Sequence, residues 1–323
     1  VGLTGLYNSP HDSDQLERST AMQPELRAID AYNPQDRLVE WIRSFGVTTV
    51  HTGHAPGELI SGQTAIIKTT GNTVDEAVLV ETAAVSATVG PDAFRSGGNP
   101  GTRAKSIAML RQELLNASAA RDKQRRAAET GAAQRNEATQ EAASGDGASS
   151  VAAGDKKDPP SPPDRNLRQE MLIAVLDGKV PLLVRADRAQ DIAGALRLAD
   201  EFGIRVMLDS AAESYLMLEE IRRAGTPVLV HPLMQRAVGE MENQSFTTPA
   251  ALARAGIPFA IQSGYEGYVP KVRVVLLEAA IAAANGLSFE QTLEAITISP
   301  ARLLGVADRV GSLEVGKDGD VAL

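Results

Sequence analysis

The chain has 323 residues, 43% of them hydrophobic and 23% charged, which is typical of a globular protein with a large core. Its net charge of −9 disfavours a nucleic-acid partner, because phosphate backbones are bound by basic surfaces, and no apolar run is long enough to span a membrane. The absence of cysteine excludes disulfides, thiolate nucleophiles and cysteine-ligated zinc. Four histidines remain to carry imidazole chemistry: His11, His51, His54 and His231.

Both ends of the sequence suggest a piece of a longer protein. The first residue is Val1, and no charged-then-apolar leader follows it. The last residues, from Asp318 to Leu323, have the pattern of the start of a strand. We therefore expect further polypeptide on either side.

The N-terminal region alternates between helical and strand patterns. A helix is expected from about Gln35 to Phe45, and it leads through Gly46 into a strand at Val47–His51. A second strand is expected at Thr64–Lys68. We expect this region to continue the strand–helix repeat that is clearer in the second half of the chain.

Residues 117–165 break this alternation. The Ala-, Arg-, Glu- and Gln-rich run Ala117–Ala143 predicts a solvated helix, and the Gly-, Ser- and Pro-rich residues after it predict a flexible linker. The segment has too little apolar surface to form a domain of its own. It is interpreted either as a disordered surface loop or as a mobile lid over the mouth of a barrel.

From Val180 onward, short β-branched strands alternate with amphipathic helices. The expected strands are Val180–Val184, Arg205–Leu208, Pro227–Val230 and Pro258–Ile261, and the expected helices are Ala189–Phe202, Ala211–Ala224 and Thr248–Ala255. Consecutive units of this length form parallel strands, because a parallel return needs a crossover.

Repeated units of this kind favour an α/β fold, a (β/α)8 TIM barrel, over an open sheet. Residues 1–116 and 166–310 are assigned to the two parts of the barrel, on either side of the insertion. In such a barrel, ligands bind where the carboxyl ends of the strands meet the loops. The polar residues expected at this edge are His51, His54, Lys68, Arg185, Asp187, Asp209, Ser210, His231, Gln262, Ser263 and Tyr265.

Several segments resemble the imidazolonepropionase-like branch of the metal-dependent amidohydrolase superfamily. They are Gln23–Ala31, Gly46–Val50, Ser61–Lys68, Ala189–Ile192, Leu196–Gly203, Phe246 with Thr248–Pro249, Ile296–Gly305 and Val310–Asp320. The resemblance implies a barrel that lacks most of its β-sandwich, with residues 311–323 beginning the return into that domain. The reaction that it implies is metal-dependent hydrolysis of carbon–nitrogen bonds in cyclic amide-like substrates.

The resemblance also assigns the positions of the family's metal ligands. A His-x-His pair would precede Val1, two further histidines correspond to Arg185 and Asp187, another to Ser210, and the proton-transferring aspartate to Gly264. Arginine stays protonated and cannot ligate a metal, serine is a weak ligand, and glycine has no side chain. We therefore expect no cofactor, unless upstream residues supply ligands for a divalent ion such as Zn²⁺.

Three groups of residues leave alternatives open. His51 and His54 are either loop histidines or a relocated metal pair. Lys68 either bridges metals as a carboxylated lysine, as in some relatives, or pairs with an acid. Arg185 and Asp187 lie two apart on a strand, so they form either an internal ion pair or part of an anion-binding pocket. The other members of that pocket would be Arg188, Lys68, His231, Tyr265 and Tyr268.

Three functions follow from these alternatives. The chain is a catalytically inactive pseudoenzyme with a binding or structural role, an active hydrolase with a rearranged or partly upstream metal site, or a ligand-binding barrel. Expected partners are a small-molecule or anionic ligand, a second copy of the chain, or an active relative. Relatives of this branch are mostly bacterial and some are exported, so a periplasmic location is favoured over a cytoplasmic one.

Overall fold

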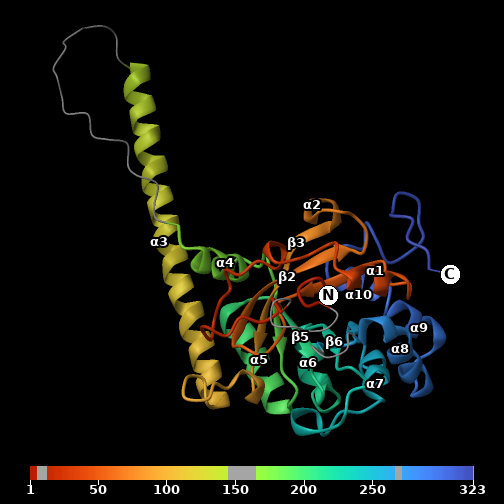
Figure 1. Cartoon of the computed structure of the whole chain (residues 1–323). Helices are drawn as coiled ribbons and strands as arrows, with labels where there is room; N and C mark the ends of the chain where they lie inside the picture. The colour runs from red at the N-terminus through yellow and green to blue at the C-terminus, as the bar shows by residue number, and fades with distance from the viewer. Residues whose placement is uncertain (6–12, 145–164, 266–270, 323) are drawn as a thin grey trace.

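A computed structural model describes residues 1–5, 13–144, 165–265 and 271–322, with backbone alone for residues 131–144. Its centre is a curled seven-stranded sheet whose strands follow one another in chain order (Figure 1). The strands are β1 (Thr49–Gly53), β2 (Ile60–Lys68), β3 (Val78–Thr88), β4 (Leu182–Arg185), β5 (Val206–Ser210), β6 (Val228–Val230) and β7 (Phe259–Ile261).

The first three strands form an antiparallel meander, whereas β3 to β7 run parallel to one another. Thr49 lies opposite Lys68 in the β1–β2 pair, and Ile60 lies opposite Ala87 in the β2–β3 pair. The expectation that the N-terminal region continues the parallel repeat is therefore wrong. The connections on either side of β2 are too short for the crossover that a parallel pair needs. Two reversals leave β1 running in the same direction as β3 to β7.

The expected elements otherwise match the structure to within a few residues, except that the helix expected from Ala211 begins only at Leu218, after a separate 3-10 turn at Ser214–Leu216. The expected helices correspond to α1 (Arg37–Arg43), α5 (Ala189–Phe202), α6 (Leu218–Ala224) and α7 (Thr248–Arg254). The remaining helices are α2 (Val74–Ala77), α3 (Arg103–Ser144), α4 (Leu167–Leu176), α8 (Val275–Ala284), α9 (Phe289–Glu294) and α10 (Ile298–Leu303). None of the helices in the described ranges is long and apolar enough to cross a membrane.

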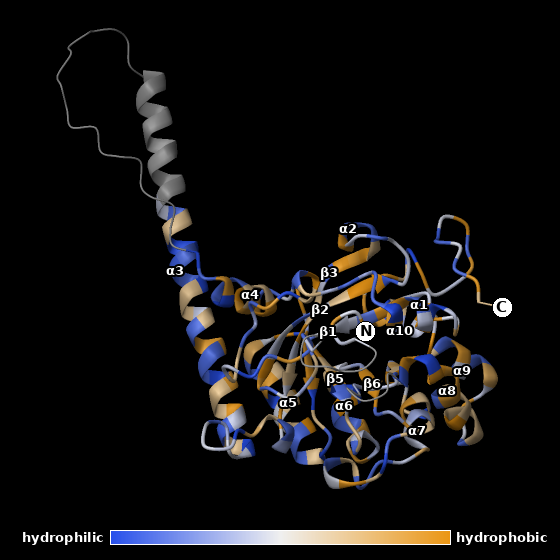
Figure 2. Cartoon of the chain, in the orientation of Figure 1, coloured by the Kyte–Doolittle hydropathy of each residue, from blue (hydrophilic) through white to orange (hydrophobic). Residues whose placement is uncertain are grey.

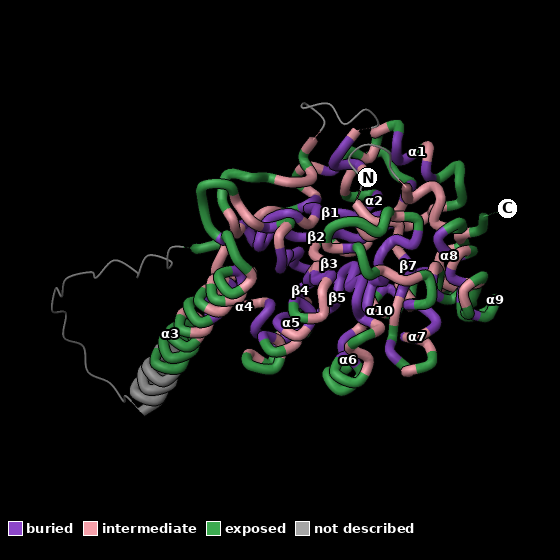
Figure 3. The backbone as a smooth tube through the Cα atoms, turned by 90° about the horizontal axis from the view of Figure 1, so that it is seen from below, coloured by how far each residue is buried: buried purple, intermediate pink, exposed green. Residues whose placement is uncertain are grey.

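Helices cover the outer face of the sheet and bury the main core there. Leu182, Val184 and Leu208 pack with buried side chains of α3, α4 and α5, such as Leu114 and Leu172. Figure 3 shows the strands as the buried centre, with exposed stretches confined to the surrounding helices and loops. The inner face carries a second apolar layer that packs against the end of α10. This layer consists of Ala84, Leu183, Met207, Leu229 and Ala260, with Leu303 and Leu304. The sheet therefore has apolar cover on both faces.

Helix α3 extends well beyond the body of the molecule (Figure 1). Its inner half buries Leu110, Leu114 and Ala117, whereas residues 122–130 are exposed and largely hydrophilic (Figure 2). The solvated helix expected over 117–143 is therefore the outer part of a longer helix that begins at Arg103. The linker residues 145–164, on which the choice between loop and lid depends, lie outside the described residues.

The described strands do not close into a barrel, since β1 and β7 are the two edges of the sheet. The strand expected from Asp318 is wrong for residues 318–322, which have no regular structure. Their conformation is held by ion pairs: Lys68 contacts Asp318 at 3.2 Å and also pairs with Asp320, and Arg309 binds Asp318 through two nitrogens.

Candidate functional site at the carboxyl edge of the sheet

The alternation of side chains along the strands builds a polar layer directly above the inner apolar layer. Leu183 and Arg185 share the inner face of β4, and Met207 and Asp209 share that of β5. Arg185 lies opposite Asp209 in the β4–β5 register. Gln262, just beyond β7, joins them by donating a hydrogen bond to Asp209 Oδ1 at 2.6 Å.

Arg185 is surrounded by carboxylates. Its Nε donates to Asp187 Oδ2 at 3.1 Å, and its Nη2 lies 3.4 Å from Asp92 Oδ2. Asp187 and Asp209 are each only 4% exposed. The internal ion pair that the sequence left as an alternative therefore forms. The donors of Arg185 face carboxylates of the chain itself, which disfavours the anion-binding alternative.

The electrostatics of this cluster follow from its burial. Burial raises the pKa of both Asp187 and Asp209, and the nearby charge of Arg185 opposes that rise. Gln262 also favours the charged form of Asp209 by donating to it. Burial, and then the charge of Asp209, raise the pKa of Tyr265. Arg185 is thus a cation whose charge opposes the effect of burial on both carboxyls.

The backbone is strained where β5 ends. Ser210 and Ala211 have φ values of 67° and 48°, in the left-handed region that non-glycine residues rarely occupy. Both are buried, and the Ser210 hydroxyl lies 3.5 Å from Met241 Sδ. Ser210, expected at a metal-ligand position, is therefore covered by a methionine from the segment that follows β6.

Gly264 sits where a side chain does not fit. Its φ is +75°, and a Cβ added there would lie 2.6 Å from Cγ of Pro232. Since real Cβ atoms are not found under 3.0 Å from such neighbours, Pro232 would have to move before any other residue could stand at this position.

His231 is a core residue of this structure. It is 1% exposed, and its ring nitrogens lie 3.4 Å from the carbonyl of Pro232 and 3.3 Å from Oγ1 of Thr248. Burial lowers its pKa to about 4, so it is neutral at pH 7. These contacts account for both nitrogens without any role in the Arg185 cluster.

Lys68 does not lie at this edge, contrary to the sequence-based expectation. Because β2 runs antiparallel to its neighbours, its last residue reaches the opposite, amino edge of the sheet. There Lys68 pairs with Asp318 and Asp320, so the alternative of a lysine paired with an acid is confirmed. Tyr268, another candidate for the anion pocket, lies outside the described residues, as does His11.

His51 and His54 have separate surroundings. His51 lies within β1, where its Nε2 is 2.7 Å from Thr64 Oγ1, and burial lowers its pKa to about 4. The ring of His54 is buried against Gly62. Over the described ranges, no three His, Cys, Asp or Glu side chains converge as a set of metal ligands.

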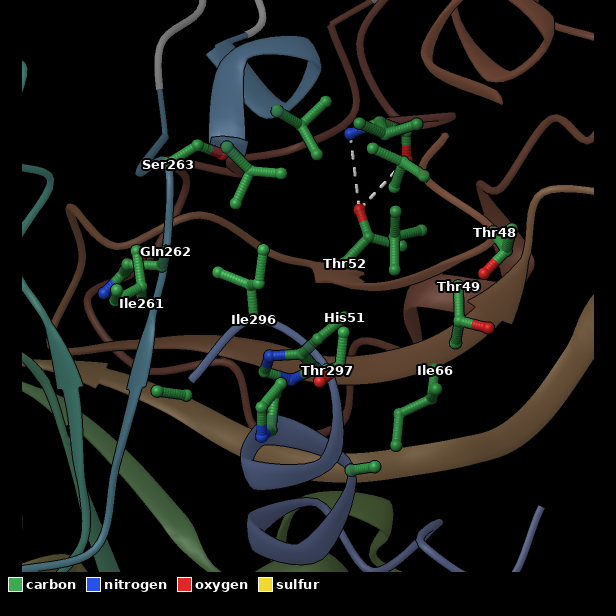
Figure 4. Close-up of a pocket in the computed structure, with 18 of the residues that line it drawn as sticks. Thr48, Thr49, His51, Thr52, Ile66, Ile261, Gln262, Ser263, Ile296 and Thr297 are labelled. Carbon is green, nitrogen blue, oxygen red and sulfur yellow. Dashed lines mark hydrogen bonds between the residues drawn. The ribbon is translucent and has the colours of Figure 1, made fainter. Parts of the chain in front are cut away.

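A cavity of about 870 Å³ separates the two edges of the sheet. Figure 4 shows His51 and Thr52 of β1 on one side, and Ile261, Gln262 and Ser263 on the other. Asp209 and Tyr265 line the same cavity, so part of the polar cluster faces it. Ile296 and Thr297, just before α10, form a further wall (Figure 4).

Several polar contacts at this edge were not anticipated from the sequence, although Arg188 itself was a candidate for the anion-binding pocket. Asp92 follows β3, a strand that was not predicted, so nothing placed it beside Arg185. Arg188 donates to Glu213 at 3.0 Å and to Glu242 at 2.7 Å, and it also binds the carbonyl of Gly239. These contacts fasten the segment after β6 over the ends of β4 and β5, and no local sequence pattern indicates them.

The fold is an α/β fold with its polar cluster at the carboxyl ends of parallel strands, the edge at which α/β proteins bind ligands. The model of the Amidohydrolase family matches residues 58–323, and the chain belongs to this family. The crystal structure of an amidohydrolase from Thermotoga maritima superposes on 99% of this chain and 77% of that one, with a TM-score of 0.85 and 26% identity.

The similar sequences belong to the imidazolonepropionase-like branch. An imidazolonepropionase from Maricaulis maris is 27% identical over 156 residues, and one from a Polaromonas species is 28% identical over 145 residues. These matches cover 48% and 45% of this chain, but only 38% and 33% of those proteins. The chain therefore spans well under half the length of these relatives.

Proposed function

We propose that this chain is an amidohydrolase-family domain that has lost hydrolysis of carbon–nitrogen bonds and acts as a binding or structural domain. The observation that carries the proposal is the Arg185–Asp187 ion pair at the carboxyl edge. The family resemblance places two metal-ligating histidines at these two positions. The guanidinium of Arg185 is permanently charged and lies 3.1 Å from the carboxylate of Asp187, so it opposes the approach of a divalent cation to that carboxylate.

The residues at the other two family positions do not fit a metal either. Ser210 lies in strained backbone beneath Met241. Gly264 offers no ligand, and Pro232 occupies the space that an aspartate would need. A catalytic zinc site needs about three protein ligands and an open position for water. The described residues do not supply that set, so we derive no hydrolytic step for this chain.

A second candidate is supported by the similarity to imidazolonepropionases. In that case the chain would be part of an active hydrolase whose metal ligands come from a rearranged site or from residues outside the sequence given. Conversion of cyclic amide-like substrates by such an enzyme would need a bound divalent metal.

We also propose that the curled sheet is completed to a barrel by one further strand between β1 and β7. Among the described residues neither strand has a second neighbour in the sheet, both run in the same direction, and the cavity between them is lined by both. Such a strand would bury the edges that otherwise invite pairing with other chains.

Hydrolysis assays on a panel of cyclic amides test the proposed function. The purified protein is incubated with each substrate after supplementation with Zn²⁺ or Mn²⁺, and ring opening is followed by chromatography. The proposal predicts no turnover above a heat-denatured control. Metal-dependent turnover that follows the purified protein through successive columns would establish the second candidate instead.

A further inference from the structure

The segment that follows β6 forms a closed loop over the carboxyl ends of β4 and β5. We call residues 235–244 the strap. Its two ends are joined, because the side-chain amide of Gln244 donates to the carbonyl of Gln235. Just before the strap, the backbone N–H groups of Leu233 and the next residue donate to the buried carboxylate of Glu278 on α8, at 2.5 and 3.0 Å. The strap is therefore one compact unit on a fixed base.

The strap inserts one side chain into the interior of the protein. Of its residues, all of which lie within the described part of the chain, only Met241 is buried. Met241 is 3% exposed, and its Sδ lies 3.5 Å from the hydroxyl of Ser210 at the end of β5. Ser210 itself is 2% exposed. Movement of Met241 away from β5 would therefore uncover Ser210.

Two arginines hold the strap from outside it. Arg188, at the start of α5, donates to Glu242 at 2.7 Å. Arg103, the first residue of α3, pairs with Glu240, and both carboxylate oxygens of Asp191 accept from its Nε at 2.9 and 3.0 Å. The side chains of Arg103 and Arg188 are 33% and 17% exposed, so salt can screen these ion pairs.

We propose that the strap is a reversible cover, held closed by Arg103 and Arg188, whose opening admits small solutes to Ser210 and the Arg185 cluster. A surface loop with one buried side chain can open locally at a lower free energy than the sheet beneath it can unfold. The inference goes beyond the proposed function, because it concerns access to this edge whether or not the chain hydrolyses a substrate. Since Arg103 begins α3, it also couples the protruding helix to the strap.

Cysteine labelling measures this opening directly. The chain contains no cysteine, so each variant carries a single thiol. Ser210→Cys places that thiol beneath Met241. Ser61→Cys is the matched control, because Ser61 is fully buried in β2 and its hydroxyl has no hydrogen-bond partner among the described residues. A thiol there reacts only when the sheet unfolds. The reaction with Ellman's reagent is followed by absorbance at low ionic strength.

We expect Ser210→Cys to react at least about ten-fold faster than Ser61→Cys, because the strap opens without the sheet. Adding Arg103→Met or Arg188→Met to Ser210→Cys should raise its rate about five-fold, whereas Arg222→Met, which removes an exposed ion pair of α6, should not. NaCl at about 1 M should raise the rate of Ser210→Cys by a similar factor without any further substitution. The rate of Ser61→Cys should change much less in every case.

Three results would overturn the inference. Equal rates for Ser210→Cys and Ser61→Cys would show that Ser210 is exposed only by global unfolding. A rate for Ser210→Cys as fast as in denaturant would show that the strap does not cover it. A rate that neither salt nor the loss of either arginine raises would show that these ion pairs do not hold the strap. The salt measurement leaves both arginines in place, so the test does not depend on the folding of Arg103→Met or Arg188→Met. Labelling is independent of the hydrolysis assay, so either proposal can fail while the other stands.

Discussion

Replacing Gly264 tests whether the family's aspartate position is closed in this chain. Gly264→Ala adds a single Cβ at a φ of +75°, 2.6 Å from Cγ of Pro232, where carbon atoms normally lie about 3.5–4 Å apart. The left-handed backbone alone costs a non-glycine residue about 1 kcal/mol. Relief of the overlap by moving Pro232 adds about 1–3 kcal/mol. We expect the free energy of unfolding, measured by equilibrium urea denaturation, to fall by about 2–4 kcal/mol.

Gly225→Ala is the matched control for this experiment. Gly225 has a φ of +63°, but nothing lies within 4 Å of its added Cβ, so only the backbone cost of about 1 kcal/mol is expected. Adding Pro232→Ala to Gly264→Ala removes the crowded Cγ and should recover at least about 1 kcal/mol in a double-mutant cycle. The reasoning is refuted if Gly264→Ala costs no more than Gly225→Ala, or if the two substitutions at 264 and 232 are simply additive.

Three further predictions follow from the contacts described. Lys68→Met should release the segment after Arg309 and raise its rate of limited proteolysis about five-fold, whereas Lys105→Met, on the exposed face of α3, should not; equal rates would contradict the anchoring role of Lys68. Arg188→Gln should speed amide hydrogen exchange across residues 236–244 about ten-fold relative to Arg222→Gln. Unchanged exchange would show that the contacts of Arg188 with Glu242 and Gly239 do not hold this segment. The pKa of His231 is lowered to about 4 because the folded state disfavours its protonation. The contribution of the neutral His231 to the free energy of unfolding is therefore complete above pH 6.5 and is lost as the pH falls towards about 4. Below pH 6.5, the unfolding free energy of His231→Gln should therefore fall less steeply than that of the unmodified protein, by about 1.4 kcal/mol per pH unit, and parallel profiles would exclude this assignment.

The parallel half of the fold was predictable because its signals are local. β4 to β7 and their helices appear in the sequence as short β-branched runs and amphipathic repeats, and α5 has the bounds that were expected. β3 was missed: three of its eleven residues are alanine, which is depleted in strands, and they interrupt its Val, Leu and Thr residues. The antiparallel direction of β2 was missed as a consequence. It follows from the short connections of β2 to β1 and to β3, and the second of these connections cannot be recognised unless β3 is predicted.

The site was also predictable only in part, because some of its residues are placed by local patterns and others by long-range contacts. The alternation of side chains along the strands was enough to place three residues on the inner face, because each lies two positions after an inward-facing apolar residue. They are Arg185, Asp209 and Gln262. Lys68 was misplaced, because the direction of β2 decides which edge its last residue reaches. Asp92 and Met241 reach the cluster from loops, and such long-range contacts have no signature in the local sequence.

The metal content of the purified protein tests the central claim most directly. The protein is loaded with an excess of Zn²⁺ or Mn²⁺, separated from free metal by gel filtration, and analysed by mass spectrometry for metal per chain. A domain whose metal position is held by Arg185 should retain far less than one equivalent. One equivalent of tightly held metal in the unmodified protein, lost on replacing Asp187 or Asp209 by asparagine, would contradict the account.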